Sequence, residues 1–151
     1  MAVSAEVVKQ LRDATGVSVM ECKKALDEAE GDMDRAIDIL KKRSAAMVAK
    51  KSDRDLGAGS VMAYVHNTSQ VGSLILLSCE TDFVSKNEEY IAIGRDIAMH
   101  IAAMRPESIE VLMTQPFIKD SSKTIADLLS GATQKFGERI EVTQMSFFTV
   151  N

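Results

Sequence analysis

The run "VGSLILLSCE", residues 71–80, is the most apolar stretch of the chain and predicts a buried β-strand. The preceding stretch "SVMAYVH", residues 60–66, is similarly rich in residues that favour strands. Between them, Asn67-Thr68-Ser69-Gln70 has the composition of a turn, and Gly72 indicates a bulge or a close approach of two backbones. These residues together predict a β-hairpin that begins at Ser60.

The residues after the hairpin predict helices and one more strand. One helical pattern ends at Arg105-Pro106, and a second begins after Thr124, whose spacing to Asp127 fits a capping box. The closing segment "RIEVTQMSFFTV", residues 139–150, alternates like a strand but loses its phase near Gln144, as a bulge would cause. The predicted fold class is therefore α+β, with a small antiparallel sheet that helices cover on one face.

The residues before the hairpin predict three short helices. Ser4, Ser18 and Asp32 stand where helix caps are expected, and Gly16 can adopt the left-handed conformation that ends the first helix. Ser18 also has capping-box spacing to Glu21. The third helix has the clearest apolar stripe, formed by Met33, Ala36, Ile37 and Leu40. Three helices this short form a small bundle that is expected to offer a face to another molecule.

The chain is accordingly divided into three parts. Residues 1–43 form the three-helix bundle, residues 44–59 a charged linker with a helical start and a glycine hinge at its end, and residues 60–151 the α+β core. At 151 residues the chain suits one small domain with an appendage.

Charge argues against direct binding to nucleic acid. The net charge is -4, and the acidic excess lies beyond residue 56, whereas a nucleic-acid binder normally has a basic excess. Residues 41–54 are locally basic, and they could contact an acidic partner or form a solvated helix end. The longest wholly apolar run is Leu74 to Leu77, far short of the roughly 20 residues that span a membrane.

Candidate catalytic and metal-binding residues are few. His66 and His100 share no local motif with each other or with a cysteine, so no zinc spacing exists, and His100 is expected to be structural. Cys22 and Cys79 lie within apolar patterns and are expected to be buried, unreactive thiols of a protein in a reducing cytosol.

A pair of carboxylates is the remaining catalytic pattern. Glu80 and Asp82 are two residues apart, which on a strand would place both on one face. The sequence offers no substrate pocket for them and no glycine-rich phosphate loop. We expect neither a cofactor nor a metal ion, and we expect the protein to act by binding. This leaves unexplained why an aromatic residue, Phe83, stands beside an acid where the strand ends.

Two separated segments resemble translation elongation factor Ts, the family that exchanges nucleotide on the GTPase elongation factor Tu. They are "LRDATGVSVMECKKALDEAEGDMDRAIDIL", residues 11–40, and "SCETDFVSKNEEY", residues 78–90. The second contains the signature of the family as Thr81, Asp82, Phe83 and Val84. Shorter matches are "AMHIAAMRP" (98–106), "QPFIKD" (115–120) and "KFGERIEV" (135–142).

The resemblance implies a role for each end of the chain. The N-terminal bundle would be of the ubiquitin-associated type and dock on the nucleotide domain of elongation factor Tu through Val19, Met20 and Lys23, with Leu11 behind them. Family members commonly carry two methionines where this chain has Val19-Met20. The signature Thr81 to Val84 would be the exchange element. Phe83 would act as a wedge and Asp82 as its polar companion, both exposed in the free protein.

The resemblance also implies an assembly. Typical members carry a long insertion where this chain has only residues 107–114. Short members pair two protomers through the C-terminal region, so a noncovalent homodimer is expected through Met145, Phe147 and Phe148. The partner would be elongation factor Tu, in its GDP-bound and nucleotide-free forms, in a bacterial cytosol. The alternative is a protein that holds elongation factor Tu without efficient exchange.

Overall fold

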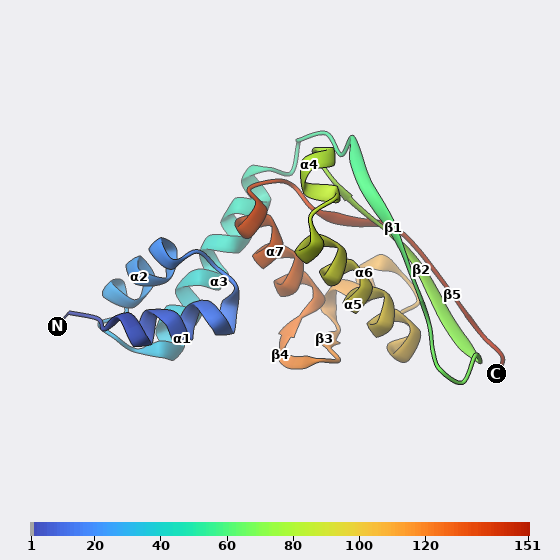
Figure 1. Cartoon of the computed structure of the whole chain (residues 1–151), viewed down its shortest axis with the longest axis horizontal. Helices are drawn as coiled ribbons and strands as arrows, with labels where there is room; N and C mark the ends of the chain where they lie inside the picture. The colour runs from blue at the N-terminus through green and yellow to red at the C-terminus, as the bar shows by residue number, and fades with distance from the viewer. Residues whose placement is uncertain (1) are drawn as a thin grey trace.

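The computed structural model describes residues 2–151 and shows a helical module at one end of an α+β core, with the two termini at opposite ends (Figure 1). The module comprises α1 (Ala5–Thr15), α2 (Val19–Glu28) and α3 (Met33–Lys50). All three expected caps are confirmed, because the side chains of Ser4, Ser18 and Asp32 each accept a hydrogen bond from a first-turn amide. Gly16 ends α1 in the left-handed conformation, with φ of 71°.

The core contains an antiparallel sheet in the order β1-β2-β5, with bounds Ala58–Val65, Val71–Cys79 and Glu141–Thr149. The predicted hairpin is confirmed, and β2 is the central strand. Leu76 pairs with Gln144 but Leu77 pairs with Val142, so Thr143 is an extra residue in β5. The bulge that the lost alternation predicted therefore exists, one residue before Gln144.

The remaining elements are helices and a small second hairpin. They are α4 (Asp82–Ser85), α5 (Glu88–Met104), α6 (Ile109–Thr114), β3 (Pro116–Phe117), β4 (Asp120–Thr124) and α7 (Ile125–Phe136). Figure 1 shows α5, α6 and α7 on the same side of the three-stranded sheet. Ile75 and Leu77 of β2 pack there against Ile97 and Ile101 of α5, all fully buried. The α+β architecture, with helices on one face of the sheet, is as the sequence predicted.

Helix α3 runs farther than its apolar stripe suggested. The expected boundary after residue 43 falls within the helix, which continues to Lys50. Ser44 is buried, and its hydroxyl donates to the side-chain oxygen of Gln134 on α7. Because α7 packs along this part of α3, the final turns of α3 are stabilised by a tertiary contact.

Two other local expectations need correction. The segment after Pro106, expected as a connector, contains α6 and the β3–β4 hairpin. The glycine hinge expected at residues 57–59 is also corrected, because β1 begins at Ala58 and Gly59 lies within this strand. A Cβ atom at Gly59 would lie 2.7 Å from the carbonyl oxygen of Leu77, so this glycine permits two backbones to approach closely.

Candidate functional site

The signature Thr81 to Val84 lies at the end of β2, where Thr81 is the N-cap of the single helical turn α4. Strand β2 ends at Cys79, and the Thr81 hydroxyl caps α4 by accepting a hydrogen bond from the Val84 amide at 3.5 Å. Val84 is buried in the core, and the carbonyl of Ser85 accepts a hydrogen bond of 2.8 Å from the Ser60 hydroxyl on β1. The turn is therefore attached to the sheet through its second half.

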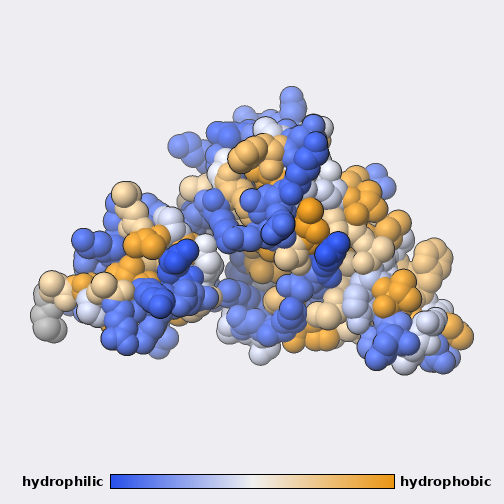
Figure 2. Space-filling model, viewed as in Figure 1, coloured by the Kyte–Doolittle hydropathy of each residue, from blue (hydrophilic) through white to orange (hydrophobic). Residues whose placement is uncertain are grey.

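The first half of the same turn faces solvent. Asp82 is exposed, and Phe83 has 87% of its surface accessible, the largest exposed fraction among the large hydrophobic residues that the structure describes. Figure 2 shows apolar surface near α4 framed by hydrophilic residues. Burying an aromatic ring is worth about 1.5–3 kcal/mol, so this exposure leaves a large favourable energy available to a partner.

The geometry of α4 argues against Glu80 and Asp82 acting as a catalytic pair of carboxylates. Asp82 starts a helix, so it does not share a strand face with Glu80. The Glu80 carboxylate instead accepts a hydrogen bond from the Arg139 amide at 2.5 Å and pairs with Arg54 at 3.4 Å. Glu80 therefore serves the structure, and the condition under which the two carboxylates would share a face, a strand running through both residues, is not met.

A groove of about 300 Å³ lies on the module between α1 and the start of α2. It is lined by Val3, Ala5, Val8, Lys9, Arg12, Val19 and Lys23. Val19 and Met20 are 54% and 68% exposed, whereas Leu11 is fully buried in the core of the module. Three cations around an apolar floor suit a partner surface with an apolar centre and acidic surroundings. Lys9 and Arg12 were not singled out from the sequence, although Arg12 follows Val8 at the i, i+4 spacing that places both on one helix face.

Comparison with known proteins gives a consistent match over nearly the whole chain. The family model described as elongation factor TS matches residues 3–111. The elongation factor Ts of Thermosipho melanesiensis is 38% identical, covering 98% of both chains. That of Leptospira biflexa is 39% identical over 99% of this chain and 98% of its own, and that of Prochlorococcus marinus is 34% identical over 98% and 89%.

The chain belongs to the elongation factor Ts family.

Elongation factor Ts is the nucleotide exchange factor of elongation factor Tu, and it acts by binding, without a catalytic residue set of its own. The alignment with the Thermosipho melanesiensis protein spans 193 positions, more than the 151 residues of this chain, so that relative contains residues that are absent here. The expected fold and family are thereby confirmed, and the roles of individual residues stay predictions.

The two cysteines and His100 are buried in surroundings that favour a structural role. Burial raises the pKa of the Cys22 and Cys79 thiols, which disfavours the reactive thiolate form. His100 is fully buried, and burial lowers its pKa. Among residues 2–151, no three or more His, Cys, Asp or Glu side chains are grouped to hold a metal ion, and no helix is long and apolar enough to cross a bilayer.

Cationic residues of the segment 41–54 make contacts within the molecule. Arg43 pairs with Glu21 at 3.3 Å and with Glu28 at 2.6 Å, both on α2. Arg54 pairs with Glu80, as described above. These contacts fasten α3 to α2 and the chain before β1 to the end of β2.

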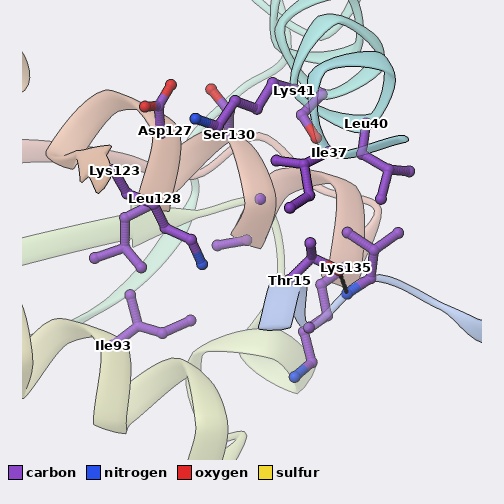
Figure 3. Close-up of a pocket in the computed structure, with 15 residues that line it drawn as sticks. Thr15, Ile37, Leu40, Lys41, Ile93, Lys123, Asp127, Leu128, Ser130 and Lys135 are labelled. Carbon is purple, nitrogen blue, oxygen red and sulfur yellow. Dashed lines mark hydrogen bonds between the residues drawn. The ribbon is translucent and has the colours of Figure 1, made fainter. Parts of the chain in front are cut away.

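A cavity of about 160 Å³ lies where the module meets the core (Figure 3). Ile37 and Leu40 of α3 line it from the module, and Ile93 and Leu128 line it from α5 and α7. Beside it, the Lys41 ammonium donates to the Ser122 carbonyl at 3.4 Å, and the Lys123 ammonium donates to the Ala14 carbonyl at 3.2 Å. We call this contact between α3 and α7, with its two lysines, the module–core seam.

The structure separates the three residues expected at a dimer interface. Met145 and Phe147 point toward the helices and pack against the core, whereas Phe148 points to the other face of the sheet and is 78% exposed. On that outer face the register places Phe148 beside Gly72 and Val65, and Leu74 beside Ala63. The outer face of the sheet therefore has an exposed apolar surface, while α5, α6 and α7 pack on the inner one (Figure 1).

Proposed function

We propose that this chain accelerates the release of GDP from elongation factor Tu by inserting Phe83 and Asp82 into it, while the groove of the helical module holds the nucleotide domain. The observation that carries the proposal is the turn α4, which exposes 87% of Phe83 while the next residue, Val84, is buried. An aromatic ring that is largely exposed while the next residue anchors the turn in the core is suited to act as a wedge.

The physical basis is the way a GTPase holds its nucleotide. GDP is retained largely through phosphate contacts and a magnesium ion, so displacing the surrounding elements weakens several charge-assisted contacts together. Phe83 would supply the apolar insertion and Asp82 would accept hydrogen bonds from displaced groups. The coupling is reciprocal, so the chain binds nucleotide-free elongation factor Tu more tightly than the GDP-bound form by the factor with which it weakens GDP.

The test is the rate at which a fluorescent GDP leaves elongation factor Tu. We expect the unmodified chain to accelerate release, and Phe83→Ala to slow the stimulated rate roughly 10-fold or more, since about 1.4 kcal/mol corresponds to a factor of ten. Asp82→Ala should also slow it. Ile118→Ala, which shortens an exposed apolar side chain on the β3–β4 hairpin, is the matched control.

The competing proposal is a protein that holds elongation factor Tu without opening its nucleotide site. It shares the docking groove but has no use for an exposed wedge. Tight binding with an unchanged rate of GDP release would favour it over exchange. Val19→Asp and Lys23→Glu, at the groove, should weaken binding under either proposal.

We further propose that two copies pair through the outer face of the sheet, with Phe148 at the interface and Met145 and Phe147 packed behind it. The exposed apolar side chains on this face support the pairing, because large exposed apolar surfaces mark interaction sites. We expect light scattering at micromolar concentration to give a dimer, and Phe148→Lys to give a monomer. Val111→Lys, at an exposed position on α6, is the control. A monomeric unmodified chain would contradict the pairing.

The proposed setting is a bacterial cytosol, where elongation factor Tu acts, with no direct contact to nucleic acid or membrane. The acidic net charge supports the absence of a nucleic-acid surface.

A further inference from the structure

We infer that Glu138 is a positioning residue for exchange, which acts by holding the turn that carries Phe83. This inference rests on the proposed exchange role of Asp82 and Phe83. Glu138 lies after α7, which ends at Gly137 in the left-handed conformation, with φ of 71°. That cap turns the chain so that Glu138 meets the end of β2.

The Glu138 carboxylate accepts three hydrogen bonds from two neighbouring residues. One oxygen accepts from the Glu80 amide at 3.1 Å and from the Thr81 amide at 3.0 Å. The other accepts from the Thr81 hydroxyl at 2.6 Å. These amides follow the last residue of β2, so this side chain takes the place of a strand partner for them.

The contact is reciprocal, because the end of β2 and the segment after α7 each offer a carboxylate to the backbone of the other. Glu80 accepts from the Arg139 amide at 2.5 Å while Glu138 accepts from the Glu80 amide. The Arg139 guanidinium also donates to the Arg54 carbonyl at 2.6 Å. The start of the exchange turn is thereby held against the segment that follows α7.

Such holding matters because α4 is too short to be stable alone. A helix of four residues has little intrinsic stability and keeps its direction only through its neighbours. The Thr81 hydroxyl donates to Glu138 and accepts from the Val84 amide, so Glu138 orients the group that caps α4. Phe83 can displace elements of a partner only if the turn that carries it stays rigid. Glu138 contributes to this rigidity by fixing the start of the turn.

The experiment combines Glu138→Ala, Glu138→Gln and Thr81→Val with Glu141→Ala as the matched control. Glu141 is the next acidic residue and contacts Arg139 without touching the exchange turn. At a concentration of the chain that saturates elongation factor Tu, we expect Glu138→Ala to slow GDP release at least 5-fold. Glu138→Gln should recover part of this rate, because an amide oxygen can still accept from both backbone amides. The losses in Thr81→Val and Glu138→Ala should be less than additive in the double variant, because both substitutions remove the bond between the Thr81 hydroxyl and the Glu138 carboxylate, whereas the cap on the Val84 amide is lost only with Thr81.

Two readouts separate positioning from a general loss of structure. The first is the ratio of the affinities for nucleotide-free and GDP-bound elongation factor Tu, which should fall in Glu138→Ala, whereas general destabilisation lowers both affinities alike. The second is hydrogen exchange in the free chain, which should speed up at the amides of residues 80–85 while the amides of β2 stay protected.

The possible failures are distinguishable. If Phe83→Ala leaves GDP release unchanged, the proposed exchange role fails and this inference fails with it. If Phe83→Ala slows release but Glu138→Ala matches the Glu141→Ala control, the exchange role stands and the positioning role of Glu138 is overturned.

Discussion

At the scale of single residues, burial and hydrogen bonding decide which polar groups belong to the structure and which remain available to a partner. His100 is fully buried on α5, and its Nδ1 accepts a hydrogen bond from the Ile118 amide at 3.1 Å. Its Nε2 lies 2.9 Å from the Gln115 side-chain oxygen and so carries the proton. The neutral ring thus ties α5 to the segment around the β3–β4 hairpin.

The first prediction concerns pH. Burial lowers the pKa of His100 below its ordinary value of about 6.5, so below that pH the unfolded chain binds a proton that the folded chain resists. The free energy of unfolding should therefore fall as the pH drops from about 7 toward 5. In His100→Gln, thermal unfolding measured across this range should show a shallower fall. The exposed His66→Gln is the matched control, and an undiminished fall in His100→Gln would contradict the prediction.

At the scale of elements, two glycines with different surroundings show how strands and helices are constrained. Gly59 of β1 lies where a Cβ atom would meet the Leu77 carbonyl, which is backbone and cannot move freely. Gly131 lies within α7, and a Cβ atom there would meet nothing within 4 Å. The first glycine is required by the hairpin, whereas the second only weakens its helix.

The second prediction follows from this contrast. Gly59→Ala should destabilise the fold by about 1–3 kcal/mol, because the backbones must separate to admit a methyl group. Gly131→Ala should stabilise it by about 1 kcal/mol through helix propensity. Chemical denaturation of the two variants beside the unmodified chain measures both effects, and equal effects of the two substitutions would show that the close approach at Gly59 does not constrain the fold.

At the scale of the whole molecule, the module–core seam sets the distance between the two surfaces proposed to bind elongation factor Tu. The groove lies on α1 and α2, and the exchange turn lies on the core, with α3 against α7 between them (Figure 1). Holding two contacts at a fixed separation makes the second contact effectively intramolecular once the first has formed. We therefore expect the seam to contribute to exchange without touching the partner.

The third prediction tests the seam. Ser44→Arg would place a charged side chain where α3 meets α7, so the module should detach and the radius of gyration should increase in small-angle X-ray scattering. The stimulated rate of GDP release should fall at low concentrations of the chain. Ala45→Arg, on the exposed side of the same helix, should change neither quantity. A compact Ser44→Arg variant with normal exchange would argue against this role of the seam.

The sequence by itself determined the features that depend on neighbours along the chain. The caps at Ser4, Asp32 and Thr124, the hairpin turn and the bulge in β5 were all predictable, because each arises from a few consecutive residues or from one alternating pattern. The signature at Thr81 to Val84 was visible in the same way, and the family followed from it together with the module.

Tertiary structure alone decided the features that need residues from distant segments. Helix α3 continues past residue 43 because α7 packs against it, and Ser18 caps α2 without a reciprocal bond from Glu21, whose carboxylate pairs with Lys24 and Arg43. Glu138 reaches Thr81 across 57 positions, and no local pattern signals that contact. The physical reason is that a carboxylate binds whichever donors the fold brings within hydrogen-bonding distance, and the distance along the chain sets no limit.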